Sequence, residues 1–422
     1  MEFKMEDENF LGEISLRLAA PKGPINLINY VYSHDDWQTS LKKPPYNFKT
    51  VRNDPDNPTH WIFVYNLFDS DFTNPVVREA RGIVLDIQNG EVVGIVSHAF
   101  DKFFNWGDPN AANIDWNSAI VQEKLDGQLV RVSRYNDKLY WFTNGSFGLN
   151  TPVDYTDDRV KNYQDLMNIA LGDDLSWLDN VSNGNTVIFE LTSRYNHIIV
   201  DYDEPKLTLL GMYADILTPQ GDSFTVIRHA FNAENALKIL GCPYDIPKTY
   251  DVHSFDEVEE MLSKFEGKSN EGVVVLDKYD NRVKIKCDDY LRIKYLLGEN
   301  GITDDRLLVA VLNNEEDDLI EIGASDIVQR IDAMKKRITD FNQCVESYFA
   351  KARAKFAEVN SARNEYAKWA LEQPEKNLWF DLIKYDNVNT YRANVWRNIK
   401  ATKHAYDEFI NGTLYKFVKE SE

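Results

Sequence analysis

The apolar pattern of this 422-residue chain changes near residue 300, and that change limits the folds it can adopt. Upstream, short apolar runs of strand length alternate with turn residues, and a few helical stretches such as 159–171 interrupt them. From residue 302 onward, apolar side chains such as Ile327, Ile331 and Met334 recur at helical spacing. The pattern predicts an α+β domain over residues 1–298 and an all-helical domain over residues 299–422.

The upstream strands are predicted from runs rich in β-branched and aromatic residues. These runs lie at 61–66, 77–86, 92–100, 129–135, 138–143, 186–191, 197–200, 207–214, 272–276 and 282–287. The order of the first three runs favours a meandering antiparallel sheet.

Composition excludes several broad classes of protein. Apolar residues make up 43% of the chain and charged residues 27%, as in folded soluble proteins rather than disordered ones. No apolar run approaches the length that spans a bilayer, and the first residues lack the shape of a signal peptide. Cys242, Cys287 and Cys344 have no paired spacing, so a reducing cytoplasm is the expected compartment and no membrane partner is expected.

The net charge of −21 argues at first against binding to nucleic acid, which depends on phosphate neutralisation. Net charge describes the whole surface, however, and says little about one groove. Residues 331–422 carry 16 Lys/Arg against 13 Asp/Glu, so the acidity lies upstream. The charge therefore does not exclude a nucleic-acid substrate.

One short stretch, Lys124-Leu125-Asp126-Gly127, places a lysine between two strand-like runs. Its plainest interpretation is a hairpin turn, because Asp-Gly between strands is a common turn signal. The alternative is a nucleophile: a lysine attacks phosphorus as the neutral amine, and neighbouring cations favour that form. Lys284 and Lys286, far downstream, are candidates for those cations.

Further polar residues stand inside or at the ends of predicted strands. Arg81 and Glu271 each precede a glycine, Glu190 lies inside Val-Ile-Phe-Glu-Leu, and Lys284 and Lys286 share one strand face. Each residue alone could belong to an ordinary solvated surface. Together the cations suit several phosphates, and the two carboxylates suit a divalent cation or a ribose. The combination predicts a site for a nucleoside triphosphate.

The order of these motifs resembles that of the covalent nucleotidyltransferases, which include ATP-dependent DNA ligases, RNA ligases and mRNA capping enzymes. Finer details over residues 60–295 are similar to the bacteriophage single-stranded RNA ligase family (RNA ligase 1), which carries an all-helical C-terminal domain. Those details are Ile62-Phe63-x-Tyr65-Asn66, Arg81-Gly82-Ile83, Lys102-Phe103-Phe104-Asn105, Lys284-Ile285-Lys286-x-Asp288 and Tyr290.

The resemblance implies a role for each matching residue. Lys124 would be the nucleophile that receives AMP, and Lys284 and Lys286 would hold the α-phosphate. Asp126 would orient the nucleophile or serve the sealing step. The remaining implied cofactor contacts are Arg81 and Lys102 to phosphate, Phe104 and Gly127 to the nucleotide, Glu190 to the ribose, Glu271 with Glu190 to a divalent metal, and Tyr290 at the cofactor or in sealing.

The implied function is an ATP-dependent RNA ligase that uses Mg²⁺ or Mn²⁺. It would join a 5′-phosphate to a 3′-hydroxyl of single-stranded or broken RNA, as in tRNA repair, through lysyl-AMP and adenylylated RNA. If phage-encoded, it would act in the host cytoplasm. The alternatives are a DNA ligase, a GTP-using capping enzyme, and a degenerate RNA-binding protein without activity.

Two positions depart from the family pattern, and one region stays ambiguous. Asn144 stands where the family has a phosphate-contacting lysine, and His197 stands where it has an arginine. In the helical domain, basic and aromatic side chains could dock structured RNA such as tRNA, or the aromatics could form the core. They include Lys335, Lys336, Arg337, Lys351, Arg353, Lys355, Trp369, Trp379 and Trp396.

Overall fold

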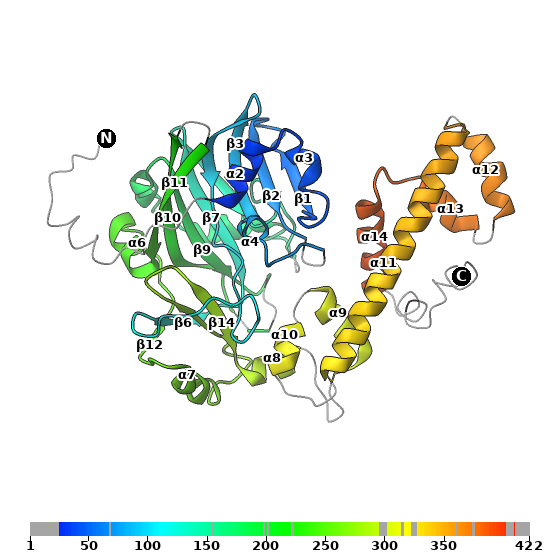
Figure 1. The fold of residues 1–422 in the computed structure, drawn as a ribbon. Helices are drawn as coiled ribbons and strands as arrows, with labels where there is room; N and C mark the ends of the chain where they lie inside the picture. The colour runs from blue at the N-terminus through cyan, green and yellow to red at the C-terminus, as the bar shows by residue number, and fades with distance from the viewer. Residues whose placement is uncertain are drawn as a thin grey trace. The chain divides into compact units, whose positions relative to one another are not determined.

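Three β-sheets form the scaffold of the N-terminal part of the chain (Figure 1). The computed structural model divides into two compact units, Met1–Glu299 and Asn300–Glu422. The described residues are 25–294, 302–401 and 409, apart from 67–68, 154–155, 197–198, 201, 221–222, 314–315, 322–326, 360 and 374–375.

The first sheet has the order β1-β2-β3-β4, with every pair antiparallel. Its helices bury Leu27, Ile28 and Val77 against Phe63 and Ile83 of the sheet. The strands are β1 (Thr50–Asn53), β2 (His60–Val64), β3 (Arg81–Gln88) and β4 (Glu91–Ser97), and the helices are α2 (Asn26–Ser33), α3 (Trp37–Ser40) and α4 (Pro75–Glu79).

The predicted strand 77–86 is wrong at its start, because residues 77–79 belong to helix α4. Asn74 caps this helix by accepting a hydrogen bond from the Val76 backbone N–H at 3.0 Å, and Pro75 occupies its first turn. Both residues favour a helix start over a strand. The strand itself begins at Arg81.

The second sheet has the order β11-β10-β9-β7-β8 and is wholly antiparallel. A core around Trp177, Met167 and Phe189 joins it to its covering helices. Its elements are β7 (Gln128–Tyr135), β8 (Lys138–Thr143), β9 (Asn185–Thr192), β10 (Lys206–Gln220), β11 (Ser223–Asn232), α5 (Tyr163–Leu171), α6 (Ala233–Leu240) and the 3-10 turn η1 (Ser176–Asn180). Strand β11 was not predicted. The helix predicted over 159–171 begins only at Tyr163, because Asn162 and Asp165 form a capping box there.

The third sheet has the order β12-β6-β13-β14-β5 and supports the predicted site. The short strand β5 runs parallel to β14, so this sheet is mixed. The antiparallel meander predicted for residues 61–100 is confirmed in the first sheet, where β2, β3 and β4 pair in chain order. Its elements are β5 (Phe104–Asn105), β6 (Ile120–Lys124), β12 (Thr249–Tyr250), β13 (Gly272–Leu276), β14 (Arg282–Lys286), α7 (Phe255–Leu262) and α8 (Asp288–Lys294).

In the described residues of the second unit, all regular secondary structure is helical. Trp379 and Trp396 are 2% and 6% exposed, so these aromatics form the core, which the sequence left undecided. No helix in the described part of the chain is long and apolar enough to cross a bilayer. The helices are α9 (Asp304–Leu312), α10 (Glu316–Glu321), α11 (Ile327–Glu358), α12 (Arg363–Glu372), α13 (Lys376–Leu382) and α14 (Val388–Ala401). The expected succession of antiparallel pairing upstream and helices downstream is confirmed in outline.

Candidate active site

The register of the third sheet brings the predicted lysines together. Lys124, the last residue of β6, pairs with Gly272 of β13, and Gly272 pairs on its other side with Lys286 of β14. Two residues further along β13, Val274 pairs with Lys284. Since side chains two apart point to the same face, the nucleophile candidate and both distant lysines share one surface of the sheet.

Gly272 allows this arrangement by having no side chain. Its φ is +150°, and a Cβ built there would lie 2.2 Å from the carbonyl oxygen of Ile285 and 2.6 Å from the Cα of Lys286. Any other residue would push β13 away from β14. The glycine therefore allows the close pairing of β13 with β14 that sets Lys286 in the same row as Lys124.

Glu271 links the two lysines through one carboxylate. Its Oε2 accepts a hydrogen bond from Lys124 Nζ at 2.5 Å, and its Oε1 lies 3.5 Å from Lys286 Nζ. The side chains of Glu271 and Lys286 are 5% and 6% exposed, whereas that of Lys124 is 21% exposed. Burial acts to raise the pKa of the Glu271 carboxyl, but the two ammonium groups outweigh it and the pKa lies below its usual value.

Glu190 lies beside this group on strand β9 of the second sheet. Its Oε1 accepts a hydrogen bond from the Gly127 backbone N–H at 3.1 Å. A Cβ on Gly127 would lie 2.5 Å from the Leu191 carbonyl oxygen, so only glycine fits this close approach. Burial raises the pKa of the Glu190 carboxyl to about 7, with Lys124 acting to lower it and Glu271 to raise it. The lysine-bearing sheet and β9 thus meet at the Asp-Gly turn.

Asp126 uses its carboxylate to hold other parts of the fold. Its Oδ2 accepts hydrogen bonds from the backbone N–H groups of Ile199 and Val200 at 2.8 and 3.0 Å, and its Oδ1 accepts one from Tyr290 Oη at 3.1 Å. These contacts replace a strand ladder, so the predicted strand 197–200 is wrong at 199–200. Residues 197–198, including the departure at His197, lie outside the described residues. Tyr290, predicted at the cofactor, is fully buried against Asp126.

The predicted phosphate contacts Arg81 and Lys102 lie among aromatic rings. The Arg81 guanidinium lies 5.2 Å from the ring centre of Phe103. The Lys102 ammonium lies 5.4 Å from the ring of Phe104 and 5.5 Å from that of Phe72. Phe104 is 7% exposed, so its ring serves first as packing for this cluster.

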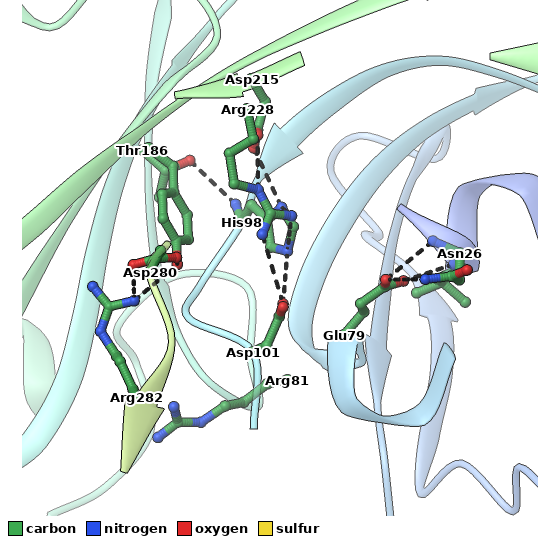
Figure 2. A network of polar contacts seen from close by, with 12 residues as sticks. Asn26, Glu79, Arg81, His98, Asp101, Thr186, Asp215, Arg228, Asp280 and Arg282 are labelled. Carbon is green, nitrogen blue, oxygen red and sulfur yellow. Dashed lines mark hydrogen bonds and ion pairs between the residues drawn. The ribbon is translucent and has the colours of Figure 1, made fainter. Parts of the chain in front are cut away.

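Lys102, Phe103 and Phe104 also line a cavity of about 460 Å³. Asp101 and Arg228, which line the same cavity, belong to a buried polar network that no motif predicted (Figure 2). There Arg228 donates from Nε to Asp215 at 3.1 Å, and His98 Nδ1 lies 3.3 Å from the same carboxylate. Burial acts to raise the pKa of Asp215, but Arg228 outweighs it. The charged groups of this network are paired with one another, which is typical of a structural role.

Sequence reasoning also missed Arg131, a fully buried arginine on β7 beside Arg81 and Gly82. The only signal is a charged residue inside the apolar run Leu129-Val130-Arg131-Val132. The remaining predicted residues, Lys124, Lys286, Glu271, Glu190 and Gly127, are in direct contact or joined through a shared partner.

Comparison with known proteins identifies the family. A family model described as RNA ligase matches residues 79–290, half of the chain. A protein of Autographa californica nuclear polyhedrosis virus, named as a bifunctional polynucleotide kinase/RNA ligase, is 31% identical over 62% of this chain, which spans 37% of that protein's length. A protein of Thermovibrio ammonificans, named as an RNA ligase, is 25% identical over 82% of this chain and 88% of its own.

Among solved structures, an archaeal ATP-dependent RNA ligase covers 78% of this chain and 82% of its own at 12% identity, with a TM-score of 0.41. The matched segment 79–290 contains every predicted site residue from Arg81 to Tyr290. The chain belongs to the RNA ligase family.

Proposed function

We propose that this chain is an ATP-dependent RNA ligase that seals a 5′-phosphate to a 3′-hydroxyl through lysyl-AMP. The observation that carries the proposal is the Lys124–Gly272–Lys286 row with Glu271 linking both ammonium groups. This arrangement supports the proposal because Lys124 as nucleophile and the lysines of β14 as fixed cations would act on one phosphate, as transfer of a phosphoryl group requires. Membership of the RNA ligase family supports the same reaction class.

In the first step, Lys124 Nζ forms a bond to the α-phosphorus of ATP while the bond from that phosphorus to the bridging oxygen breaks. The bridging oxygen keeps the electron pair and leaves as pyrophosphate. Before attack, Nζ must give up the proton that it donates to Glu271, because only the lone pair of the neutral amine can attack. Lys284 and Lys286 would stabilise the charge that develops on the α-phosphate.

In the later steps, the AMP passes to the 5′-phosphate of an RNA strand, which breaks the nitrogen–phosphorus bond and restores the lysine. A 3′-hydroxyl then attacks the 5′-phosphate, and AMP leaves. Glu190 would accept hydrogen bonds from the ribose, Arg81 and Lys102 would contact phosphates, and Phe104 would line the nucleotide site. The buried contacts of Asp126 and Tyr290 favour a supporting role for both.

The donor set suits a cation that is partly held by substrate. Glu271 and Glu190 supply two carboxylates, and no cluster of three His, Cys, Asp or Glu able to hold a metal occurs among the described residues. Mg²⁺ and Mn²⁺ fit such a site, since Mg²⁺ usually binds through one or two carboxylates together with phosphates and water. When bound, the cation would neutralise phosphate charge.

We further propose that the first unit is the adenylation domain, and that the helical unit helps choose the RNA, a broken tRNA being the favoured substrate. Because Trp379 and Trp396 form the core of the helical unit, the exposed cations of that unit, such as Lys336, would contact the RNA. The proposed compartment is a reducing cytoplasm, that of a host cell if the chain is phage-encoded; Cys242, Cys287 and Cys344 are unpaired.

The test is incubation with α-labelled ATP or GTP followed by denaturing electrophoresis. We expect acid-labile label from ATP on the wild type, none on Lys124→Ala, and normal labelling on Lys138→Ala, which alters an exposed lysine of β8. EDTA should abolish labelling, and Mg²⁺ or Mn²⁺ should restore it. Label from GTP instead would indicate a capping enzyme, and no label from either would indicate a degenerate binding protein.

The substrate test is circularisation of a 5′-phosphorylated single-stranded RNA. A matched single-stranded DNA and a nicked DNA duplex run beside it. We expect the RNA to be sealed, whereas preferential sealing of the nicked duplex would identify a DNA ligase.

A further inference from the structure

Arg131 is buried in the interior of the first unit without a carboxylate partner. Its side chain is 0% exposed, and no Asp or Glu among the described residues forms an ion pair with it. Other buried arginines of this unit are paired: Arg228 with Asp215, and Arg282 with Asp280. Because an unpaired buried guanidinium is costly, Arg131 needs another explanation.

The contacts of Arg131 join two segments at the edge of the candidate site. Its Nη2 donates to the carbonyl oxygens of Gly82 and Thr143 at 2.8 and 3.2 Å, and its Nη1 lies 3.5 Å from that of Arg81. The segments touch directly, since a Cβ on Gly82 would lie 2.3 Å from the Asn144 carbonyl oxygen. Arg131 therefore fixes the backbone on which Arg81 and Asn144 stand.

Three buried polar atoms in this region have no hydrogen-bond partner within the described structure. They are Nε of Arg131, Nη1 of Arg81 and Oδ1 of Asn144. Burial lowers the pKa of Arg131 to about 9, and the nearby charge of Arg81 acts in the same direction. Two cations thus stand close together, and no carboxylate among the described residues forms an ion pair with either.

The position of Arg81 ties this pair to the proposed reaction. The charge of Arg81 acts on Glu190, which also interacts with Lys124 and Glu271. Figure 2 draws no interaction between Arg81 and the charged network around Arg228. Arg81 and Lys124 thus act on the same carboxylate, and an anion bound beside Arg81 would supply the ion pair that Arg81 and Arg131 lack.

We propose that Arg131 is a positioning residue that holds Arg81 for the terminal phosphates of ATP, and that these phosphates supply the negative charge the pair lacks. The inference rests on the proposed function and adds a residue to it. The cation that the family resemblance expects at position 144 would here come from the neighbouring strand, at Arg131. Its charge would favour departure of pyrophosphate, which leaves with the electron pair of the broken bond.

The test uses four variants: Arg131→Gln, Arg131→Lys, Asn144→Lys, and Arg131→Gln combined with Asn144→Lys. The matched control is Arg134→Gln on the same strand. Arg134 also donates to carbonyl oxygens, those of Val181 and Leu178, but these lie away from the site. Three quantities are measured: KM for ATP in lysyl-AMP formation, affinity for tripolyphosphate by calorimetry, and the rate of sealing pre-adenylylated RNA, which needs no ATP.

For Arg131→Gln we expect KM for ATP to rise and tripolyphosphate affinity to fall by about tenfold, the loss typical of one charge-assisted contact. Sealing of pre-adenylylated RNA should stay near the wild-type rate. Asn144→Lys in the same chain should recover most of the tripolyphosphate affinity, because it restores a cation beside Arg81. Arg134→Gln should leave all three quantities unchanged.

Wild-type tripolyphosphate affinity in Arg131→Gln, or equal losses in both reaction steps, would overturn the proposal. Should Arg131→Gln not fold, Arg131→Lys decides, since one ammonium cannot reproduce the contacts to three carbonyl oxygens. Lower tripolyphosphate affinity with normal sealing of pre-adenylylated RNA supports the proposal, and wild-type affinity in a folded Arg131→Lys overturns it. Absence of lysyl-AMP in the wild type would reject the proposed function instead, while tripolyphosphate binding would still report on Arg131.

Discussion

Lys124 and Lys286 stand in one row across three strands, with Gly272 of β13 between them. These residues are more than a hundred positions apart in the sequence, and Glu271, next to the glycine, contacts both ammonium groups. Substitutions in this row and in the residues around it should therefore change stability or adenylylation.

Gly272→Ala should disturb both stability and adenylylation. Its Cβ would lie 2.2 Å from the Ile285 carbonyl oxygen, so β13 and β14 must separate, at a cost of about 1–3 kcal/mol in the free energy of unfolding. Gly90→Ala is the control, because φ there is also positive but nothing lies within 4 Å. Chemical denaturation of both variants checks the expectation, and equal losses would contradict the close-approach explanation.

Glu271→Gln should leave two ammonium groups facing a neutral amide. We expect the free energy of unfolding to fall by about 2–3 kcal/mol, less than for a fully buried pair because Lys124 is partly exposed. Adding Lys286→Met should recover part of the loss. Glu260→Gln, which breaks an exposed pair with Lys264, is the control and should change little. Strict additivity in the double variant would show that Glu271 and Lys286 are not coupled.

Glu190→Gln should change the pH dependence of stability. Because the pKa of Glu190 is raised to about 7 in the folded chain, the folded state binds a proton more tightly than the unfolded state. Its contribution to stability is therefore full below the unfolded pKa and is lost as pH rises toward 7. The variant lacks this loss, so its Tm relative to wild type should be higher at pH 8 than at pH 4.5, by ~3 °C. An offset that is constant with pH would refute the raised pKa.

Asp126→Asn should act through the fold. The change weakens the hydrogen bonds from Ile199, Val200 and Tyr290, so we expect a loss of about 1–3 kcal/mol in the free energy of unfolding. Tyr290→Phe removes only one of those bonds and should cost less. Thermal unfolding ranks the two variants. A fully stable Asp126→Asn that has lost lysyl-AMP formation would instead assign Asp126 to the chemistry.

Local sequence rules predicted the strands that carry the site. The runs 272–276 and 282–287 match β13 and β14 within one residue, because both are short, β-branched and bounded by turn residues. These local rules could not predict which distant segments pair with one another. The contact of Lys124 with Glu271 follows from register across the third sheet, and only the family resemblance pointed to it.

The missed features depend on three-dimensional context. Periodicity gives no sign that Arg131 would be buried without an acidic partner, since most arginines in strands stay solvated. Periodicity also placed residues 77–79 in a strand, although the Asn74-Pro75 pair is a common signal for the start of a helix. Apolar spacing in the helical unit could not tell core tryptophans from exposed ones, because that depends on which helices pack together.

Strand β6 pairs with β13 as far as its last residue, Lys124, and pairs on its other side with β12 at Val121 and Gln122. A lysine on a flexible loop can carry a covalently bound group from one site to another. A lysine at the end of a paired strand can move only its own side chain. If Lys124 carries AMP as proposed, the broken RNA must travel to a stationary adenylate. The enzyme would then select the two RNA ends by how well each can be brought to Lys124.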